Sequence, residues 1–217
     1  MTALLLICGG SLAGCAGGAR HESTKLGPRI IPLGQPVPKG GGTYLVGSPY
    51  IINGQQYAPR EVPGYSRFGV ASWYGELFHG RRTANGEIFD MEALTAAHPT
   101  LPLPSYVRVV NPRNGRWLVL RLNDRGPFAY KREIDLSWAA AVLLDIAGPG
   151  TGYVRVDYLG PAPLDGNDSY ERNVLARQTW AGSQVAFAKS PAKAFMAESR
   201  KYYSFYEPKP VSNGFLR

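Results

Sequence analysis

Apolar and polar residues alternate in the middle of the chain with the two-residue period of a β-strand. Over residues 106–110 the valines alternate with Tyr106 and Arg108, and a short loop containing Asn114-Gly115 leads into a second apolar run over 117–122. Asn-Gly tolerates the positive φ angles that a tight hairpin turn requires. The two runs therefore predict a β-hairpin. Comparable short runs predict further strands over residues 68–74, 94–97 and 153–159.

Two other patterns predict a smaller hairpin and a single helix. Residues 50–57 form two β-prone runs around Asn53-Gly54, and this hairpin should pack on the main domain because an isolated hairpin is marginal in water. Ser137 can cap a helix that runs to about Ile146 and stops at Gly148-Pro149. Several short strands with one late helix indicate a small β-barrel or α+β barrel rather than a parallel βαβ fold.

The flanks of the chain lack this periodicity. With 26 Gly and 18 Pro among 217 residues, the composition favours one compact domain with irregular ends. Residues 16–45 are rich in Gly, Pro and charge, which predicts a flexible tether, and the barrel with its entry hairpin is expected over 46–160. Residues 161–217 are expected to form a basic tail of low order, in which 170–178 and 186–203 could be short helices.

The first residues suggest an export and lipidation signal. An apolar run over 3–10 is too short to span a bilayer but suits the core of a signal peptide, and Leu-Ala-Gly at 12–14 precedes Cys15. This pattern resembles a bacterial lipoprotein box, so residues 1–15 are expected to be the signal and Cys15 the lipidated residue. Ala16 implies, by the same resemblance, an outer-membrane destination. The alternative is an apolar helix with an incidental cysteine, and the lack of a Lys or Arg before the run departs from the usual signal.

Charge and residue counts exclude several kinds of function. The net charge of +8 suits an acidic polymer or an anionic surface, and nucleic acid is the weakest candidate because no block of basic residues and no zinc-finger spacing occurs. Both cysteines lie in the first 15 residues, which excludes a cysteine nucleophile in the mature domain. The three histidines lack the spacing of a zinc site, and no Gly-x-Ser-x-Gly elbow occurs. The sequence therefore predicts neither a metal nor another cofactor.

The strongest chemical signal follows the predicted strand over 117–122. The segment 123–128 reads Asn-Asp-Arg-Gly-Pro-Phe, which places the carboxyl group of Asp124 and the guanidinium of Arg125 on a turn. A carboxylic acid can donate a proton to a leaving oxygen and, once ionised, accept a proton from an attacking group. By itself, an Asp in such a turn is more often a turn former or the partner of an arginine.

Four further blocks give this turn its context. With it, the blocks are Ala71-Ser72-Trp73-Tyr74-Gly75, Thr83-Ala84-Asn85-Gly86-Glu87, Leu94-Thr95-Ala96-Ala97-His98, Asn123-Asp124-Arg125-Gly126-Pro127-Phe128 and Ile134-Asp135-Leu136-Ser137. In order and spacing they resemble the rare lipoprotein A family, over residues 46–159. This resemblance implies a mainly β fold, a six-stranded double-psi β-barrel shared with expansins and with membrane-bound lytic transglycosylase A. It also implies an envelope lipoprotein whose catalytic members act on peptidoglycan strands stripped of stem peptides.

The resemblance also assigns residues to a catalytic cleft. Asp124 matches the catalytic acid of the family, and Glu87, Asp90 and His98 match its other polar positions. Glu87 would raise the pKa of Asp124 or orient the attacking hydroxyl, and the alternative is a simple turn residue. His98 would donate to Asp90 or to an N-acetyl group, and the alternative is a hydrogen bond at the end of a strand.

Four more residues are expected to contact the sugar. Trp73 and Tyr74 are candidates for stacking on sugar faces, although one of the two alternating rings should belong to the core. Thr83 belongs to the same group, and Arg125 would neutralise Asp124 or bind a muramoyl carboxylate. Asp135 is expected to be a helix-start or buried structural carboxylate rather than a catalytic one.

Two functions from different classes remain open at this stage. The first is a lytic transglycosylase that cleaves the β-1,4 bond between N-acetylmuramic acid and N-acetylglucosamine and leaves a 1,6-anhydro end. Because the muramoyl 6-hydroxyl replaces water as the attacking group, one positioned acid suffices. The second is a lipoprotein that binds peptidoglycan, or organises division proteins, without cleaving it. The occurrence of Glu87, Asp90, His98 and Asp124 together favours the enzyme.

Overall fold

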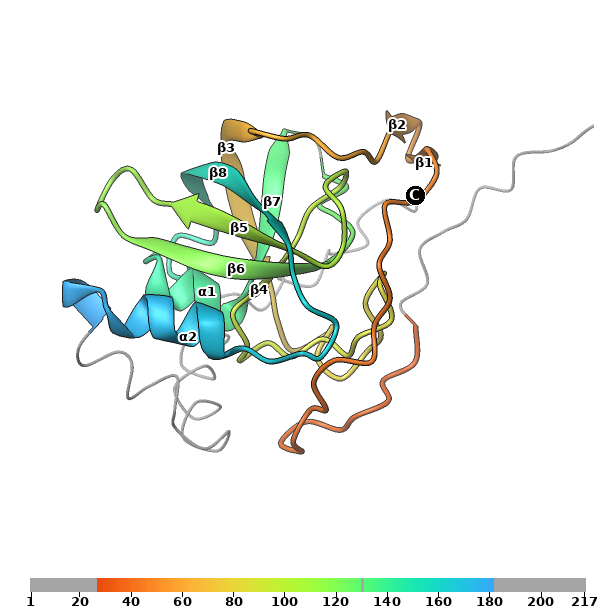
Figure 1. The fold of residues 1–217 in the computed structure, drawn as a ribbon, viewed down its shortest axis with the longest axis horizontal. Coiled ribbons are helices and arrows are strands. Elements are labelled where there is room, and N and C mark those ends of the chain that lie inside the picture. The colour runs from red at the N-terminus through yellow and green to blue at the C-terminus, as the bar shows by residue number, and fades with distance from the viewer. Residues whose placement is uncertain (1–26, 130, 182–217) are drawn as a thin grey trace, which may run out of the picture.

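The computed structural model describes residues 27–129 and 131–181. Six of its strands close into a barrel in the order β3-β7-β4-β6-β5-β8 (Figure 1). The β3–β7 and β4–β6 pairs are parallel and the others are antiparallel. This mixed closed barrel confirms the mainly β, six-stranded fold that was expected. Its strands are β3 (Ser66–Tyr74), β4 (Thr95–Ala97), β5 (Ser105–Val110), β6 (Trp117–Asp124), β7 (Arg132–Ser137) and β8 (Gly152–Pro161).

The barrel interior follows from the alternation seen in the sequence. Val107 and Val109 of β5 and Val154 and Val156 of β8 have no exposed surface, whereas the residues between them are partly exposed. The predicted β5–β6 hairpin is confirmed, with Val109 opposite Leu118. Since alternate side chains point to opposite faces of a strand, this register places one apolar set inside the barrel.

The strand β7 was not predicted as an element. It begins with two charged residues, and only Ile134 and Leu136 provide an apolar alternation, which is too short to distinguish a strand from a helix entry. In the structure β7 lies between β3 and β4, where Asp135 is opposite Ser72 of β3. The missed strand therefore brings Asp135 into the middle of the barrel wall.

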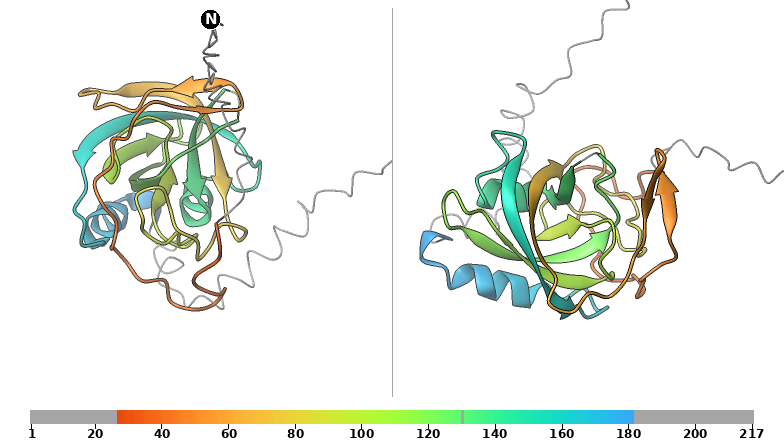
Figure 2. Two further views of the ribbon diagram at one scale, coloured as in Figure 1. Left: turned by 90° about the vertical axis from the view of Figure 1, so that its right-hand side faces the viewer. Right: turned by 90° about the horizontal axis from the view of Figure 1, so that it is seen from above.

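The small hairpin predicted around Asn53-Gly54 is confirmed. It consists of β1 (Tyr50–Ile52) and β2 (Gln55–Tyr57), and both turn residues have positive φ angles, 49° and 78°. The hydroxyl of Tyr50 donates to the carbonyl of Pro99 at 2.7 Å, which ties the hairpin to the barrel. The hairpin lies beside the barrel (Figure 2).

The predicted helix is present but shorter than expected. α1 spans Trp138–Leu143, and the Oγ of Ser137 accepts from the backbone N–H of Ala140 at 3.2 Å, which confirms the N-cap. The helix ends before Ile146 because Asp145 takes a left-handed conformation with φ of 61°. Asp tolerates this region better than most side chains, so the chain leaves the helix three residues earlier than Ile146.

The first part of the expected low-order tail is folded onto the barrel. α2 (Ser169–Ala176) packs along β6, and the 3₁₀-helix η1 (Thr179–Ala181) follows it (Figure 1). Glu171, Leu175 and Ala181 are buried. The low apolar content of this segment hid its packing, because only a few side chains carry the contact. Residues 182–217, with the second possible helix, lie outside the described residues. None of the helices over 27–129 and 131–181 is long and apolar enough to cross a membrane.

The second half of the expected flexible tether also lies against the barrel. Residues 28–45, here called the strap, run along one side of the molecule (Figures 1 and 2). Its backbone pairs with three loops: Ile30 N–H donates to Gly80, Thr43 N–H donates to Asn85, and Leu45 exchanges hydrogen bonds with Leu103, at 2.6–2.9 Å. The Nζ of Lys39 lies 2.6 Å from a carboxylate oxygen of Asp168. Backbone hydrogen bonds need no side-chain period, which is why the sequence pattern did not reveal them.

The strap depends on the absence of a side chain at Gly80. Gly80 has a φ of 75°, and a Cβ atom there would lie 1.9 Å from the carbonyl oxygen of Ile31. We expect Gly80→Ala to lower the free energy of unfolding by about 2–4 kcal/mol, from left-handed strain plus lost strap hydrogen bonds. Gly115 is the matched control, because its φ is 74° with no atom within 4 Å, and Gly115→Ala should cost only about 1 kcal/mol. Urea unfolding measures the loss of unfolding free energy in the two variants, and proteolysis of the strap shows whether it has detached. Equal losses in the two variants would contradict the close contact between Gly80 and the strap.

Candidate active site

Asp124 ends strand β6 with one carboxylate oxygen held by the backbone. Its Oδ1 accepts from the N–H of Ala84 at 2.9 Å and from its own neighbour Arg125 at 2.8 Å, while the residue keeps partial exposure. Burial raises the pKa of Asp124 to about 6, against the opposing effect of these two N–H groups. A carboxyl group with this pKa is partly protonated near neutral pH, as a general acid requires.

Asp135 is the second carboxylate of this region. Ala97 of β4 pairs with Asp124 on one side and with Asp135 on the other, so the three residues share one rung of the sheet. Side chains on one rung emerge on the same face, and two strand spacings place the Asp124 and Asp135 backbones about 10 Å apart. The Ser72 hydroxyl donates to Asp135 at 2.5 Å. The negative charge of Asp135 also contributes to the raised pKa of Asp124. This role was not predicted, because β7 was not recognised as a strand that lies near Asp124.

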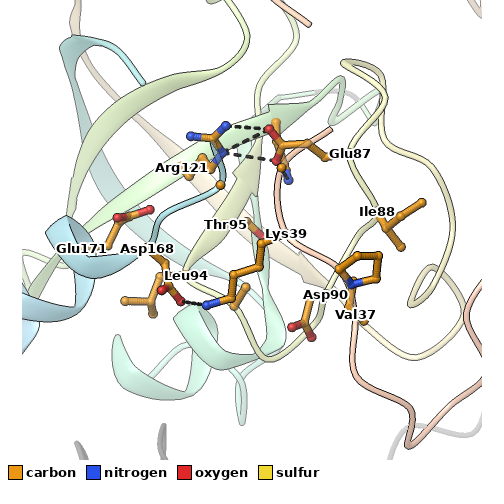
Figure 3. Close-up of a pocket in the computed structure, with 15 residues that line it drawn as sticks. Val37, Lys39, Glu87, Ile88, Asp90, Leu94, Thr95, Arg121, Asp168 and Glu171 are labelled. Atoms are coloured by element: carbon orange, nitrogen blue, oxygen red, sulfur yellow. Dashed lines mark hydrogen bonds and ion pairs between the residues drawn. The ribbon is translucent and has the colours of Figure 1, made fainter. Parts of the chain in front are cut away.

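Glu87 is buried, with its carboxylate fully engaged by protein groups. Arg121 Nη2 lies 2.6 Å from Oε1 (Figure 3). Asn85 Nδ2 donates to Oε1 at 3.0 Å, and Asn123 Nδ2 donates to Oε2 at 3.0 Å. The residue is 5% exposed. Burial opposes ionisation of Glu87, but hydrogen bonds from Arg121 and Asn123 outweigh it and lower the pKa. The expected effect of Glu87 on the Asp124 pKa, or on an attacking hydroxyl, is therefore replaced by a buried ion pair.

The turn over residues 83–87 connects this ion pair to Asp124. The Thr83 hydroxyl donates to Asn85 Oδ1 at 2.8 Å, and the Thr83 N–H donates to the carbonyl of Glu87 at 2.8 Å. Thr83 is buried, so it supports the turn instead of lying open to a sugar. Because Glu87 fixes the turn to β6 and Ala84 lies within that turn, Glu87 positions the N–H that holds Asp124.

His98 is buried in a network of its own. Its Nδ1 accepts from the N–H groups of Thr100 at 3.2 Å and Leu101 at 3.0 Å, so the ring proton lies on Nε2, which faces the Tyr65 hydroxyl at 3.0 Å. Tyr65 in turn donates to Glu133. Burial lowers the pKa of His98, with Glu133 opposing the effect. With 1% of its surface exposed, His98 does not make the contact with Asp90 that had been expected. It follows the last residue of β4 and forms the strand-end hydrogen bonds of the alternative interpretation.

Asp90 lies with Glu87, at a different place from Asp124. A small cavity of about 50 Å³ under the strap is lined by Glu87 and Asp90 together with strap residues 37–40, whereas Asp124 and His98 do not line it (Figure 3). Asp90 Oδ1 accepts from the Glu92 N–H at 2.9 Å and lies 3.7 Å from His79 Nδ1. The four polar residues expected in one cleft are thus divided: Glu87 and Asp90 line the cavity under the strap, whereas Asp124 and His98 lie outside it.

The two aromatic rings expected to stack on sugar are packed within the protein. Tyr74 is 9% exposed and stacks on Phe89 at 4.1 Å, so it is the core member of the pair. Trp73 is half-buried, lies edge-on to Trp138 at 4.7 Å, and donates from Nε1 to Ala147 at 3.3 Å. Burial raises the pKa of Tyr74, and nearby Asp124 adds to the effect. The Tyr74 hydroxyl therefore belongs to the surroundings of the acid.

Arg125 does not form the expected ion pair with Asp124 within the described part of the chain. Its guanidinium donates to backbone carbonyls instead: Nη1 to Leu101 at 2.5 Å and to His98 at 3.2 Å, and Nη2 to Val46 at 2.6 Å. Arg125 thereby ties the residues before the small hairpin to the Asp124 turn. A guanidinium with five donors suits this task, because it can serve several carbonyls at once.

The remaining sequence predictions concern lipidation and metal binding. Cys15 lies outside the described residues, so the lipidation expectation is untested. Over residues 27–129 and 131–181, no group of three or more His, Cys, Asp or Glu side chains is placed to hold a metal ion.

The barrel and its partly exposed acid define a class of protein. A family model described as lytic transglycolase, built on the double-psi β-barrel, matches residues 66–158. Curated relatives identify the family within this class. The chain is 37% identical over 162 residues to the endolytic peptidoglycan transglycosylase RlpA of Rickettsia bellii, covering 73% of this chain and 70% of the relative. The chain belongs to the RlpA family.

Other relatives are more similar but longer. The RlpA of Pseudomonas aeruginosa strain UCBPP-PA14 is 49% identical over 163 residues, which cover 75% of this chain and 46% of the relative. The RlpA of Neisseria meningitidis serogroup B is 50% identical over 113 residues, covering 52% of this chain and 47% of the relative. The chain thus spans slightly less than half the length of these two relatives.

Proposed function

We propose that this chain is a peptidoglycan lytic transglycosylase with Asp124 as its general acid. The observation that carries the proposal is the state of Asp124, a partly exposed carboxyl group whose pKa burial raises to about 6 and whose Oδ1 two backbone N–H groups hold in place. Membership of a family whose curated relatives are named endolytic peptidoglycan transglycosylases supports the substrate. The fixed Oδ1 leaves Oδ2 as the oxygen that faces a glycosidic bond.

The proposed reaction needs one proton donor and acceptor. Protonated Asp124 gives its proton to the glycosidic oxygen as the bond between the muramoyl C1 and that oxygen breaks. The resulting carboxylate accepts the proton of the muramoyl 6-hydroxyl, whose oxygen bonds to C1. The products are a 1,6-anhydromuramoyl end and a free 4-hydroxyl on N-acetylglucosamine, and Asp124 returns to its protonated form. The raised pKa supports both half-reactions, because the group gives up and regains a proton near neutral pH.

The preferred substrate of this proposal is a glycan strand without stem peptides, at the cell envelope. Family membership supports an envelope setting through the substrate named for the relatives. We further propose that the chain is lipid-anchored through Cys15 and faces the periplasm from the outer membrane. Replacing Cys15 with alanine should then move the protein from the membrane fraction to the soluble one.

Digestion of purified glycan strands tests the proposed function. Strands freed of stem peptides are incubated with the full chain, and mass spectrometry separates 1,6-anhydro ends from reducing ends. We expect anhydro ends to accumulate with the protein and to be fewer when stem peptides are retained. Reducing ends would indicate hydrolysis by water instead. Binding of the strands without new ends of either kind would favour the alternative, a peptidoglycan-binding lipoprotein without catalytic activity.

A further inference from the structure

A groove lies between the small hairpin and residues that follow the Asp124 turn. One wall is the β1–β2 hairpin, the other is formed by residues 127–129 with Lys131 and Arg132, and together they enclose about 690 Å³. Pro127, at one end of the groove, is three residues from Asp124, so at most about 11 Å of backbone separates them. The side chains that give the groove its chemistry are Asn53, Gln55, Tyr57, Phe128, Lys131 and Arg132.

The aromatic side chains of the groove are fixed before any ligand arrives. Tyr57 stacks on Tyr50 with centroids 5.3 Å apart, and both rings meet the edge or face of Phe128 at 5.7 and 6.0 Å. The Tyr50 hydroxyl is tied to Pro99, and Arg125 holds the carbonyl of Val46. These contacts hold the hairpin wall against Phe128 and the turn that carries Asp124. A site fixed in this way loses little freedom on binding.

The polar side chains give the groove a positive, hydrogen-bonding character. Asn53 and Gln55 present exposed amides on the hairpin wall, and Lys131 is exposed on the opposite wall. Arg132 is partly exposed, while its Nη1 donates to Ser72 at 2.8 Å and Nη2 lies 3.4 Å from Asp135. None of the described residues that line the groove is acidic. Aromatic faces suit the apolar faces of sugar rings, amides suit N-acetyl groups, and cations suit a carboxylate.

We propose that this groove is a glycan subsite that recognises the lactyl ether carboxylate of a muramoyl residue through Lys131. The inference rests on the proposed function, which it deepens: a strand whose scissile bond lies at Asp124 continues into the groove. An N-acetylated amino sugar with a carboxylate substituent matches the aromatic, amide and cationic side chains together. A glycan that lacks the carboxylate matches the aromatic and amide side chains but not the cationic ones.

Binding of two tetrasaccharides tests the subsite. One alternates N-acetylglucosamine and N-acetylmuramic acid without peptide, and the other is chitotetraose, which has no carboxylate. Titration calorimetry uses the full chain carrying Asp124→Asn to prevent turnover. We expect Lys131→Gln to weaken binding of the muramoyl ligand about fivefold and that of chitotetraose less than twofold. Arg113→Gln, an exposed cation in the β5–β6 loop, is the matched control and should change neither. Equal effects of Lys131→Gln on both ligands, or none, would overturn the proposal.

A second pair of variants tests the aromatic wall. Tyr57→Ala should weaken both ligands about fivefold because the stacking face is lost, whereas Tyr57→Phe keeps the ring and should bind within twofold of the parent. Thermal unfolding shows whether each variant is folded. Tyr57→Ala that binds both ligands normally would contradict the subsite.

The outcomes separate the subsite from the proposed reaction. Anhydro ends from the unmodified chain together with an unaffected Lys131→Gln variant would refute the subsite and leave the reaction standing. Preferential loss of the muramoyl ligand in Lys131→Gln, with no ends formed by the unmodified chain, would refute the reaction and leave the subsite standing.

Discussion

Replacing Asp124 with asparagine is expected to reduce the rate at which 1,6-anhydro ends form by about 10²–10⁴-fold, the range typical of a general acid. Asparagine keeps an oxygen that can accept from the N–H groups of Ala84 and Arg125, so the local geometry should persist. The matched control is Asp145→Asn, an exposed residue with φ of 61°, a conformation that asparagine adopts readily. Initial rates of anhydro-end formation measure the effect. Equal rates for Asp124→Asn and the unmodified chain would exclude Asp124 as the acid.

The same residue sets the expected pH dependence of the unmodified chain. Only protonated Asp124 can give a proton to the leaving oxygen, and burial raises its pKa to about 6. The value of kcat/KM should therefore fall about tenfold for each pH unit above about 6. A rate that stays constant from pH 5 to pH 8 would contradict this assignment.

Asp124 should also lower the stability of the folded chain at neutral pH, so that Asp124→Asn raises stability while it lowers activity. The carboxyl group ionises near pH 4 in the unfolded chain but near pH 6 in the folded one, so the folded state binds more protons between these values and loses stability as pH rises through them. Asp124→Asn removes this cost. We expect the variant to unfold with a free energy about 1–2 kcal/mol higher at pH 7 and nearly equal at pH 4, with the shift discounted for the partial exposure of the group.

Glu87→Gln is expected to cost about 3–5 kcal/mol of unfolding free energy, because it leaves the buried guanidinium of Arg121 without its counter-charge. The ion pair of 2.6 Å has side chains only 6% exposed on both partners, so water cannot replace the lost carboxylate. Urea unfolding measures the cost. Glu61→Gln, which removes an exposed carboxylate, is the matched control and should change stability by less than about 0.5 kcal/mol.

The effect of Glu87→Gln on activity distinguishes a positioning residue from a catalytic one. If Glu87 holds the turn that presents the Ala84 N–H, its loss weakens a hydrogen bond that lowers the pKa of Asp124. The alkaline limb of kcat/KM should then move to higher pH, along with a loss of rate. A slower variant with an unmoved limb and unchanged stability would contradict the positioning role.

Much of the barrel could be predicted because local alternation coincides with burial. β5, β6 and β8 carry valines and leucines at every second position, and the Asn-Gly pairs mark both hairpins. β7 could not be assigned, since its first two residues are charged and its pairing partners come from distant segments. The possible helix over 170–178 is present as α2, but its packing on the barrel and the docking of the strap were not predicted. Backbone hydrogen bonds and a few buried side chains hold these segments, and neither leaves a periodic pattern.

For the candidate site, the sequence predicted which residues matter better than what each side chain contacts. The sequence blocks located Asp124 and its neighbours, but they could not show how deeply each side chain is buried. Glu87, His98 and Arg125 are polar residues that a reader of the sequence would direct towards a substrate. In the structure their partners are Arg121, Tyr65 and backbone carbonyls. Burial depends on segments far apart in the chain, such as the strap over Glu87, so it becomes visible only once the strands are closed.

The docking of the strap also limits the distance between the barrel and a lipid anchor at Cys15. With Cys15 as the lipid-bearing residue, a free segment over 16–45 would let the barrel reach about 100 Å from the lipid surface. Because the strap is hydrogen-bonded to the barrel from Ile30 onwards, the length between Cys15 and the barrel is that of residues 16–29, at most about 50 Å when fully extended. Under the proposed lipid anchoring and the proposed reaction, only glycan strands within this distance of the membrane would be accessible to Asp124. Strands in deeper layers of the wall would come within reach only if the strap detached from the barrel.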